Sequence, residues 1–247
     1  MVNGFHMSNF NKKIIFTGGN GRFGQVLQKT KFKHKVFFPA KSELNILNIN
    51  SIEKYLDKKK PDILIHMAAL SRPMDIHDTN IIKSINLNII GTSNITIACA
   101  KRKIKLIYFS TQYVYPGIKG KYKETDSLLP VNNYGWSKLG GESAVQMYKN
   151  SLILRLCMTE KPFIHKSAFS DVKTNFIFHD EIIPILNKLL NKKGIINLGG
   201  PIKSVYNFAI KNNPQIKKIS AKKTFKGKFP LNPSMSLQKL NKILNND

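Results

Sequence analysis

Tyr134 and Lys138 are four residues apart in the stretch Tyr-Gly-Trp-Ser-Lys. In a helix, this spacing places both side chains on one face. A nearby ammonium favours the phenolate form, so Lys138 is expected to lower the pKa of Tyr134 from its usual value of about 10. Such a phenol can donate or accept a proton near neutral pH. An isolated pair of this kind is more typical of a surface helix, so the interpretation needs a cofactor loop and a third polar group.

A glycine-rich turn follows the first apolar run, residues 13–17, and precedes a helical pattern. In a dinucleotide-binding loop, Gly18 would permit a tight turn, Gly21 the close approach of the backbone to pyrophosphate, and Gly24 the packing of helix on strand. Free N–H groups at the helix start would bind the phosphates. The spacing is Gly-x-x-Gly-x-x-Gly, and its place after the first strand favours cofactor binding.

The end of the second predicted strand, residues 35–38, bears on the choice of cofactor. NAD-binding sites commonly place Asp or Glu there to hold the ribose hydroxyls, but no carboxylate follows until Glu43. Arg22 and Lys41 could instead meet a 2′-phosphate. NADP(H) is therefore favoured, and NAD(H) remains possible, since both residues are also ordinary solvated cations in a lysine-rich chain.

A third polar group follows the predicted strand 103–109, which runs into Ser110 and Thr111. Hydroxyls at the carboxyl end of a parallel strand face the crevice where ligands bind. The strand predicted at 61–69 ends in Ala68 and Ala69, which are small enough to let a cofactor pass. These residues would complete a site with the Tyr134 helix.

Strands alternate with helices through the first half of the chain, with a helix expected at 81–100 and a strand at 152–156. This predicts an α/β fold with a doubly wound parallel sheet, Rossmann-like, over residues 1–156. Residues 157–247 are expected to form a small, shortened substrate-binding lobe, interleaved with the first domain rather than independent. Further elements predicted there are an apolar run at 176–178, a helix capped by Asp180, a strand at 194–198 and a final helix near 237–244.

The composition is strongly basic, with 40 Lys and Arg against 14 Asp and Glu, a net charge of +26. Such an excess suggests a polyanionic partner. However, the lysines are scattered, and no arginine-rich block or aromatic-interleaved basic stripe is present. We therefore favour a compositional origin of the charge over specific nucleic-acid binding.

Several classes of function lack support in the sequence. Cys99 and Cys157 cannot build a disulfide framework, and no apolar run reaches membrane-spanning length, so a reducing, cytoplasmic setting without a membrane is expected. The six histidines do not cluster at metal-ligand spacings, so no metal site is predicted. Neither a Gly-x-Ser-x-Gly elbow nor a phosphate-binding Gly-Lys-Ser/Thr motif occurs.

Taken together, three motifs resemble the extended short-chain dehydrogenase/reductases that act on nucleotide sugars, most closely the dTDP-4-dehydrorhamnose reductases. The motifs are Thr17-Gly-Gly-Asn-Gly-Arg-Phe-Gly24, Ser110-Thr-Gln-Tyr-Val-Tyr-Pro-Gly117 and Pro130-Val-Asn-Asn-Tyr-Gly-Trp-Ser-Lys-Leu-Gly-Gly-Glu142. The resemblance covers about two-thirds of the chain. It departs from the family at Gln112, where the family has aspartate, and in a short segment between Arg155 and Phe176.

The resemblance implies a role for each site residue. Thr111 would polarise the substrate carbonyl beside Ser110, Tyr134 would protonate the alkoxide at sugar C4, and Lys138 would hold the nicotinamide ribose. It also implies a set of cofactor-binding residues: Gly18, Gly21, Arg22, Phe23, Gly24, Lys41, Asn45 (where the family has an aspartate near the adenine), Ala68, Ala69, Tyr134 and Lys138. Lys161, His165, Lys166 and Lys173 could bind a pyrophosphate, although plain surface charges are the simpler interpretation.

Four functions remain in competition. The first is an NAD(P)H-dependent reductase of a 4-keto nucleotide sugar, a small-molecule substrate. The second is an epimerase with tightly bound NAD, and the third a non-catalytic NADP-binding subunit of the same fold. Nucleic-acid binding comes fourth and is not expected. A homodimer is a possible assembly. The polar constellation favours the reductase, because fold analogy alone cannot rank these functions.

Overall fold

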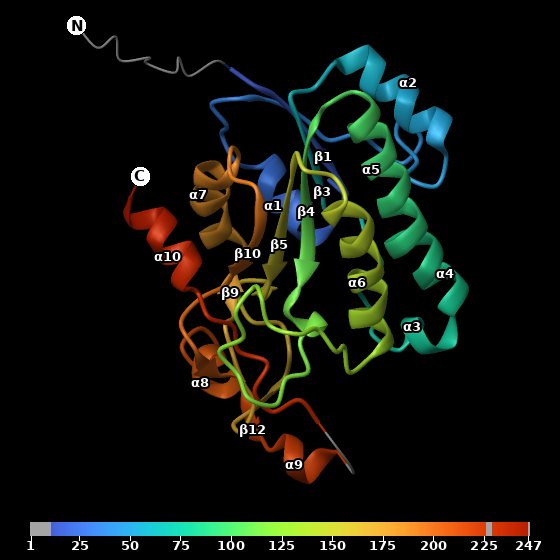
Figure 1. Cartoon of the computed structure of the whole chain (residues 1–247). Helices are drawn as coiled ribbons and strands as arrows, with labels where there is room; N and C mark the ends of the chain where they lie inside the picture. The colour runs from blue at the N-terminus through green and yellow to red at the C-terminus, as the bar shows by residue number, and fades with distance from the viewer. Residues whose placement is uncertain (1–10, 226–228, 247) are drawn as a thin grey trace, which may run out of the picture.

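Six parallel strands form the centre of the molecule, in the order β10-β5-β4-β3-β1-β2 (Figure 1). The structure, a computed structural model, describes residues 11–225 and 229–246. Every residue of the central strands β3, β4 and β5 is buried, as expected for parallel strands covered on both faces. The sheet strands are β1 (Lys13–Thr17), β2 (Lys35–Phe37), β3 (Ile63–His66), β4 (Lys105–Thr111), β5 (Ser151–Leu156) and β10 (Gly194–Leu198).

Helices cover both faces of the sheet, and each face has its own apolar core. Along β1, Ile14 and Phe16 belong to one core and Ile15 to the other, which follows the alternation of side chains in a strand. One face is covered by α1 (Arg22–Gln28), α7 (His179–Leu189) and α10 (Gln238–Asn245), and the other by α2 (Ile49–Lys59), α5 (Gly91–Lys101) and α6 (Asn133–Gln146) (Figure 1). The predicted doubly wound α/β fold is confirmed.

A smaller lobe lies below the carboxyl ends of the sheet strands in Figure 1. It has its own apolar core, which includes Phe163, Ala168 and Ile216. Its elements, with the short 3-10 turn that follows β4, are η2 (Gln112–Val114), β6 (Met158–Thr159), β7 (Ser167–Phe169), β8 (Lys173–Thr174), β9 (Ile177–Phe178), β11 (Lys203–Ser204), α8 (Val205–Ala209), β12 (Lys217–Ile219) and α9 (Ala221–Thr224).

The sheet order reverses at β1, which has β2 on one side and β3 on the other. Ligands of open α/β sheets bind in the crevice at such a switch point, beyond the carboxyl ends of the strands. The glycine turn lies here, because a Cβ added at Gly18 would come within 2.8 Å of the Ala68 backbone nitrogen, just beyond β3. The chain thus places its glycine motif at the edge where a ligand is expected.

The predicted helix at 81–100 consists of α4 (Ile81–Ile85), the π-helical turn η1 (Asn86–Ile90) and α5, preceded by α3 (Ile76–Thr79). Several isoleucines of its apolar pattern face outward, with Ile82 70% and Ile97 48% exposed, whereas Asn88 and Thr92 are fully buried. No helix in the described ranges combines the length and apolar character needed to cross a bilayer.

Two sequence-based boundaries need correction. Asp180 was predicted to cap α7, but the helix begins one residue earlier and Phe178 is its N-cap. The Glu181 carboxylate, instead of Asp180, accepts a hydrogen bond from the Phe178 backbone N–H at 2.8 Å. The predicted strand 61–69 is shorter, since β3 ends at His66 before Ala68 and Ala69. The first ten residues of the predicted first domain lie outside the described ranges.

Candidate active site

Helix α6 carries Tyr134 and Lys138, and its start is fixed by Asn132. The Asn132 side chain accepts a hydrogen bond from the Gly135 backbone N–H at 2.8 Å, which is a standard N-cap. Tyr134 is half-buried in the first turn, and Lys138, one turn further along, is 2% exposed. The Lys138 ammonium lies 4.2 Å from the centre of the Tyr108 ring on β4. The predicted helical spacing therefore holds, and it directs Lys138 toward the sheet.

Ser110 and Thr111 end strand β4 and are both buried. The Thr111 hydroxyl accepts a hydrogen bond from the Tyr113 backbone N–H at 3.3 Å, and it lies near enough to the Tyr134 phenol to oppose the rise in the pKa of that phenol. The Ser110 hydroxyl oxygen has no hydrogen-bond partner within the described part of the chain. A buried hydroxyl without a partner is costly, and a ligand group would satisfy it. The structure thus brings the predicted hydroxyl and phenol together.

The electrostatics of the pair differ from the sequence-based expectation. Removal from water raises the pKa of Tyr134 to about 12, although Thr111 and Arg72 oppose this rise. Burial lowers the pKa of Lys138 to about 7, against the opposing charge of Glu142. Lys138 does not lower the pKa of Tyr134, because desolvation dominates both groups and weakens the charge of the lysine itself. In the free protein, Tyr134 is a protonated phenol at neutral pH.

A buried ion pair lies behind Lys138. Glu142, four residues along α6, accepts three hydrogen bonds from Arg155 of β5, the shortest at 2.8 Å, and both side chains are 1–2% exposed. Arg155 also donates to the Tyr115 hydroxyl at 2.8 Å, and Tyr115 in turn donates to Asn197 of β10 at 2.8 Å. The pair therefore connects the helix of the candidate site to two strands of the sheet.

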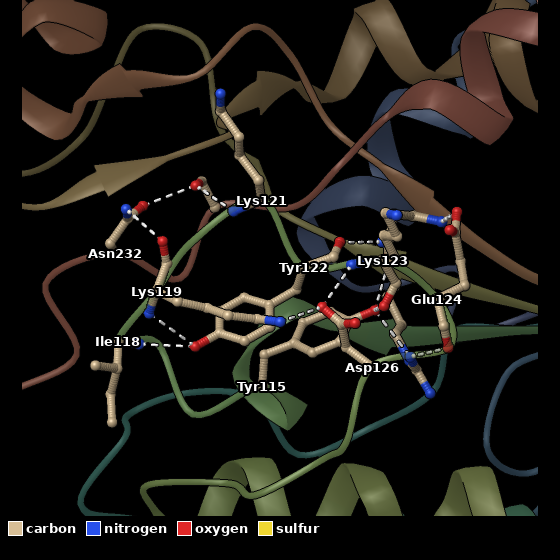
Figure 2. Close-up of polar contacts among 12 residues, drawn as sticks. Tyr115, Ile118, Lys119, Lys121, Tyr122, Lys123, Glu124, Asp126 and Asn232 are labelled. Atoms are coloured by element: carbon tan, nitrogen blue, oxygen red, sulfur yellow. Dashed lines mark hydrogen bonds and ion pairs between the residues drawn. The ribbon is translucent and has the colours of Figure 1, made fainter.

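The long segment between β4 and α6 is held by its own polar contacts, drawn in Figure 2. The Tyr122 hydroxyl accepts hydrogen bonds from the backbone N–H groups of Ile118 and Lys119, at 2.9 and 3.1 Å. Lys119 forms an ion pair with Asp126 at 3.0 Å, and the Tyr115 and Tyr122 rings stack. A hollow of about 430 Å³ opens on this segment, lined by Pro116, Ile118, Lys119, Tyr122, Thr125, Asp126 and Ser127. None of these residues belongs to the candidate site.

The glycine turn fits a dinucleotide. Gly18 has φ +78°, a conformation that favours glycine, and a Cβ at Gly24 would lie 2.2 Å from the Gly19 carbonyl oxygen. At exposed Gly21, in contrast, a Cβ would meet only the Gly18 carbonyl oxygen, at 3.1 Å, among the described atoms beyond its chain neighbours. The turn is packed underneath and open outside, so a pyrophosphate could approach the backbone. Phe23 is buried beneath it, against Phe109.

Arg22 and Lys41, the two cations predicted to contact a 2′-phosphate, have different surroundings in the structure. Arg22 donates to Glu160 of the second lobe at 2.9 Å, whereas Lys41 is exposed in the turn after β2. The Glu43 carboxylate accepts a hydrogen bond from the Ala40 backbone at 2.9 Å, and the Asn45 side chain accepts one from the Leu47 backbone at 3.1 Å. Both Glu43 and Asn45 thus stabilise their own turns.

Sequence reasoning missed Asn88, which lies in the π-helical turn η1. Its amide donates to the Ser137 hydroxyl of α6 at 2.9 Å and to the Leu70 carbonyl at 2.8 Å, and its side-chain oxygen accepts from the Leu70 N–H at 2.7 Å. Asn88 therefore ties α6 to the segment that follows Ala68 and Ala69. Single π-helical turns occur frequently at functional sites, but the sequence carries no recognisable signal for one.

His66 and His77 have contacts of local structure. His66 is fully buried between the hydroxyls of Thr17, at 2.8 Å, and Thr92, at 3.1 Å. Burial lowers its pKa to about 3, so it stays neutral. His77 contacts the Ser84 hydroxyl at 2.7 Å and packs against the Tyr134 ring. Within residues 11–225 and 229–246, no three His, Cys, Asp or Glu side chains gather to hold a metal ion.

Comparison with known proteins points to one family. A family model described as the RmlD substrate binding domain matches residues 12–159, more than half of the chain. Over 152 residues, the chain is 31% identical to a dTDP-4-dehydrorhamnose reductase of Aggregatibacter actinomycetemcomitans, covering 60% of this chain and 51% of that protein. Over 145 residues, it is 29% identical to the methionine adenosyltransferase 2 subunit beta of Pongo abelii, covering 55% of this chain and 43% of that protein. The chain thus spans about half the length of the curated relatives it matches.

The fold is also found in solved structures. The crystal structure of a dTDP-4-dehydrorhamnose reductase from Bacillus anthracis, in complex with NADP, superposes with a TM-score of 0.83. The superposition covers 95% of this chain and 92% of that chain, at 24% sequence identity. This likeness shows that the fold extends over both the sheet and the smaller lobe.

Proposed function

The chain belongs to the RmlD substrate binding domain family, and on this basis we propose that it is an NAD(P)H-dependent reductase that transfers a hydride to the 4-keto group of a nucleotide-linked deoxysugar. One observation carries the proposal: Thr111 lies near the Tyr134 phenol, and buried Lys138 follows one turn along the same helix, at the edge of the sheet that holds an open glycine turn. The relative from Aggregatibacter actinomycetemcomitans is named as a reductase of this kind. The smaller lobe, within residues 157–247, would hold the sugar nucleotide.

Each side chain has a distinct task in this mechanism. The bound cofactor supplies the hydride. Thr111 donates a hydrogen bond to the substrate carbonyl, and the unpartnered Ser110 hydroxyl is available to a second substrate oxygen. Tyr134, whose raised pKa keeps it protonated at neutral pH, donates its proton to the developing alkoxide. Lys138 binds the nicotinamide ribose. The protein supplies position and charge, as is usual for cofactor enzymes.

NADPH is the proposed cofactor, with NADH as the second choice. The end of β2 offers no free carboxylate for ribose hydroxyls, because Glu43 is bonded to the Ala40 backbone. Lys41, exposed in the same turn, suits a 2′-phosphate. The reductase from Bacillus anthracis was crystallised with NADP. Fluorescence titration with both cofactors tests this choice, and tighter binding of NADH would contradict it.

The decisive experiment is turnover. Absorbance at the nicotinamide band is followed with NADPH and a panel of 4-keto sugar nucleotides, beginning with dTDP-4-dehydrorhamnose. NADPH oxidation that depends on both the sugar and Tyr134 supports the reductase. The match to methionine adenosyltransferase 2 subunit beta favours one alternative, a non-catalytic nucleotide-binding subunit. That alternative predicts cofactor binding with no oxidation by any sugar in the panel.

Proton uptake on cofactor binding is expected from Lys138. In the free protein its pKa is about 7, and hydrogen bonds from its ammonium to the ribose hydroxyls would raise that pKa. At pH 8, binding should therefore take up about one proton, and affinity should fall about tenfold per pH unit above pH 7. Calorimetry in buffers of different ionisation enthalpy measures the uptake. Lys138→Met should abolish it, and a wild-type value near zero would contradict the role given to Lys138.

We further propose a homodimer and a cytoplasmic location. Ile82, Ile97 and Trp136 are 70%, 48% and 49% exposed on the neighbouring helices α4, α5 and α6, and an apolar surface of this kind suits a second copy better than a polyanion. Ile82→Lys should shift the protein toward a monomer in light-scattering chromatography, and an unchanged mass would count against this face.

Both cysteines are buried free thiols, which supports a reducing compartment.

A further inference from the structure

A charge cluster lies where the glycine turn, the loop after β3 and the smaller lobe meet. Glu160, just beyond β6, accepts a hydrogen bond from Arg22 at 2.9 Å and one from Arg72 at 3.3 Å, both on the same carboxylate oxygen. Its other oxygen accepts from the Thr159 hydroxyl at 3.3 Å. The carboxylate is only 16% exposed, whereas Arg22 and Arg72 are 52% and 32% exposed. One anion therefore faces two cations, and the cluster keeps an excess positive charge.

The positive charge of the two arginines affects two neighbouring histidines. Burial is the main cause of the lowered pKa values of His165 and His179, and the charges of Arg72 and Arg22 lower both values further. Glu160 opposes the shift at both histidines, and at His179 its charge counts for more than that of either arginine. Only 14 acidic residues are present in the whole chain. A carboxylate that joins two arginines at this point is therefore a distinctive feature of the chain.

The cluster borders the part of the site that would receive a diphosphate. Arg22 directly follows Gly21, whose outer side is open, and Arg72 lies on the loop that begins at Ala68. A diphosphate at this turn would carry more negative charge than one carboxylate, and guanidinium groups bind phosphate in a bidentate manner. The diphosphate and the Glu160 carboxylate would therefore compete for the same two side chains.

We propose that Glu160 is a built-in counter-ion, which holds Arg22 and Arg72 in the free protein and is displaced from them by the diphosphate of a bound dinucleotide. The inference rests on the proposed function, because it names Arg22 and Arg72 as the diphosphate ligands of that same site. Glu160 then limits cofactor affinity, since the ligand must first replace its contacts and then tolerate its charge. The bound state leaves Glu160 facing solvent or Thr159.

Glu160→Gln separates this role from a purely structural one. Removing the charge should tighten binding of NADPH by about three- to tenfold, because competition and repulsion are both relieved. The same change should slightly lower the unfolding midpoint of the free protein, because a partly exposed ion pair contributes little stability. A residue that only supports the fold would weaken both binding and stability. Tighter NADPH binding together with a lower unfolding midpoint is therefore the result expected of a displaced counter-ion.

The experiment titrates wild type, Glu160→Gln and a matched control with NADPH and, separately, with inorganic pyrophosphate. The control is Asp126→Asn, which breaks the Lys119–Asp126 ion pair on the segment drawn in Figure 2. The two atoms of that pair are 3.0 Å apart, and the carboxylate is 23% exposed. This control variant should leave both affinities unchanged. Arg72→Gln should weaken both ligands about fivefold or more, and should remove most of the gain from Glu160→Gln when the two changes are combined.

The two ligands distinguish the possible failures. If wild type does not bind NADPH, the proposed function is wrong, and the pyrophosphate titration still decides the role of Glu160. The counter-ion role is overturned if Glu160→Gln binds pyrophosphate no more tightly than wild type. It is also overturned if neither protein binds pyrophosphate at about 10 mM. Tighter binding in Asp126→Asn as well would show a general charge effect and would also overturn it.

Discussion

Replacing Tyr134 by Phe should lower kcat by about 10²- to 10⁴-fold, the usual contribution of a positioned general acid. In the proposed mechanism the phenol near Thr111 donates the proton, and its pKa of about 12 keeps that proton in place at neutral pH. The Kd for NADPH should change little, because Lys138 and the glycine turn are the proposed cofactor ligands. Single-turnover reduction, followed by absorbance, separates the chemical step from cofactor binding.

Tyr148→Phe is the matched control. Its hydroxyl donates to the Ile104 carbonyl at 2.9 Å, just beyond the far end of α6, so this variant also removes one phenol hydroxyl. It should keep the native kcat. Native turnover in Tyr134→Phe would show that another group supplies the proton, and the catalytic role assigned to this residue would then be lost.

Replacing Glu142 by Ala should destabilise the protein by about 3–5 kcal/mol, because the Arg155 guanidinium would remain buried without its counter-charge. This is a large part of the stability of a typical domain, about 5–15 kcal/mol. Glu142→Gln keeps the shape and an acceptor, and should cost less while remaining measurable if the alanine variant fails to fold. Urea unfolding gives both values.

The surface pair of Glu53 and Lys101 provides the comparison. Its atoms are 3.0 Å apart, as close as a good ion pair, but the side chains are 27% and 60% exposed. Glu53→Gln should therefore cost far less stability than Glu142→Ala. Equal losses of stability for Glu53→Gln and Glu142→Ala would show that burial of the Glu142–Arg155 pair adds no stability. That result would contradict the role of this pair in holding α6 on the sheet.

The sequence predicted the sheet better than it predicted the contacts between distant segments. Alternating strands and helices specify their own local structure, so β1, β5 and β10 lie close to their predicted positions. Asp180 is a good capping residue by type, yet Glu181 takes the hydrogen bond because α7 begins at His179. Such shifts of one or two residues depend on packing, which local preference does not encode.

The candidate site was predicted in part for the same reason. Tyr134 and Lys138 lie on one helix, and their spacing is visible in the chain. Glu160 and Arg72 are 88 residues apart and meet only in the folded protein. The expected lowering of the pKa of Tyr134 was wrong, because it counted the charge of Lys138 and omitted the desolvation of both groups.

The ion pair of Arg155 could have been predicted from the sequence. It is a single charge inside the apolar run of β5, and a buried arginine needs a partner. Glu142, one helical turn beyond Lys138, was the natural candidate. Asn88 had no such signal, because asparagine within a helical pattern is common and the π-helical turn that directs it inward is not encoded by periodicity.

Strand β10 has a consequence for how the protein is made. It pairs with β5 along all five of its residues, but it follows that strand by almost forty positions, after most of the smaller lobe. During synthesis, β5 leaves the ribosome as an open edge, and that edge is covered only when residue 198 has emerged. Until then the nascent chain exposes an edge strand with four apolar side chains, one serine and one arginine, and neighbouring chains could pair with it. Synthesis of β10 therefore protects the part of the sheet that was made before it.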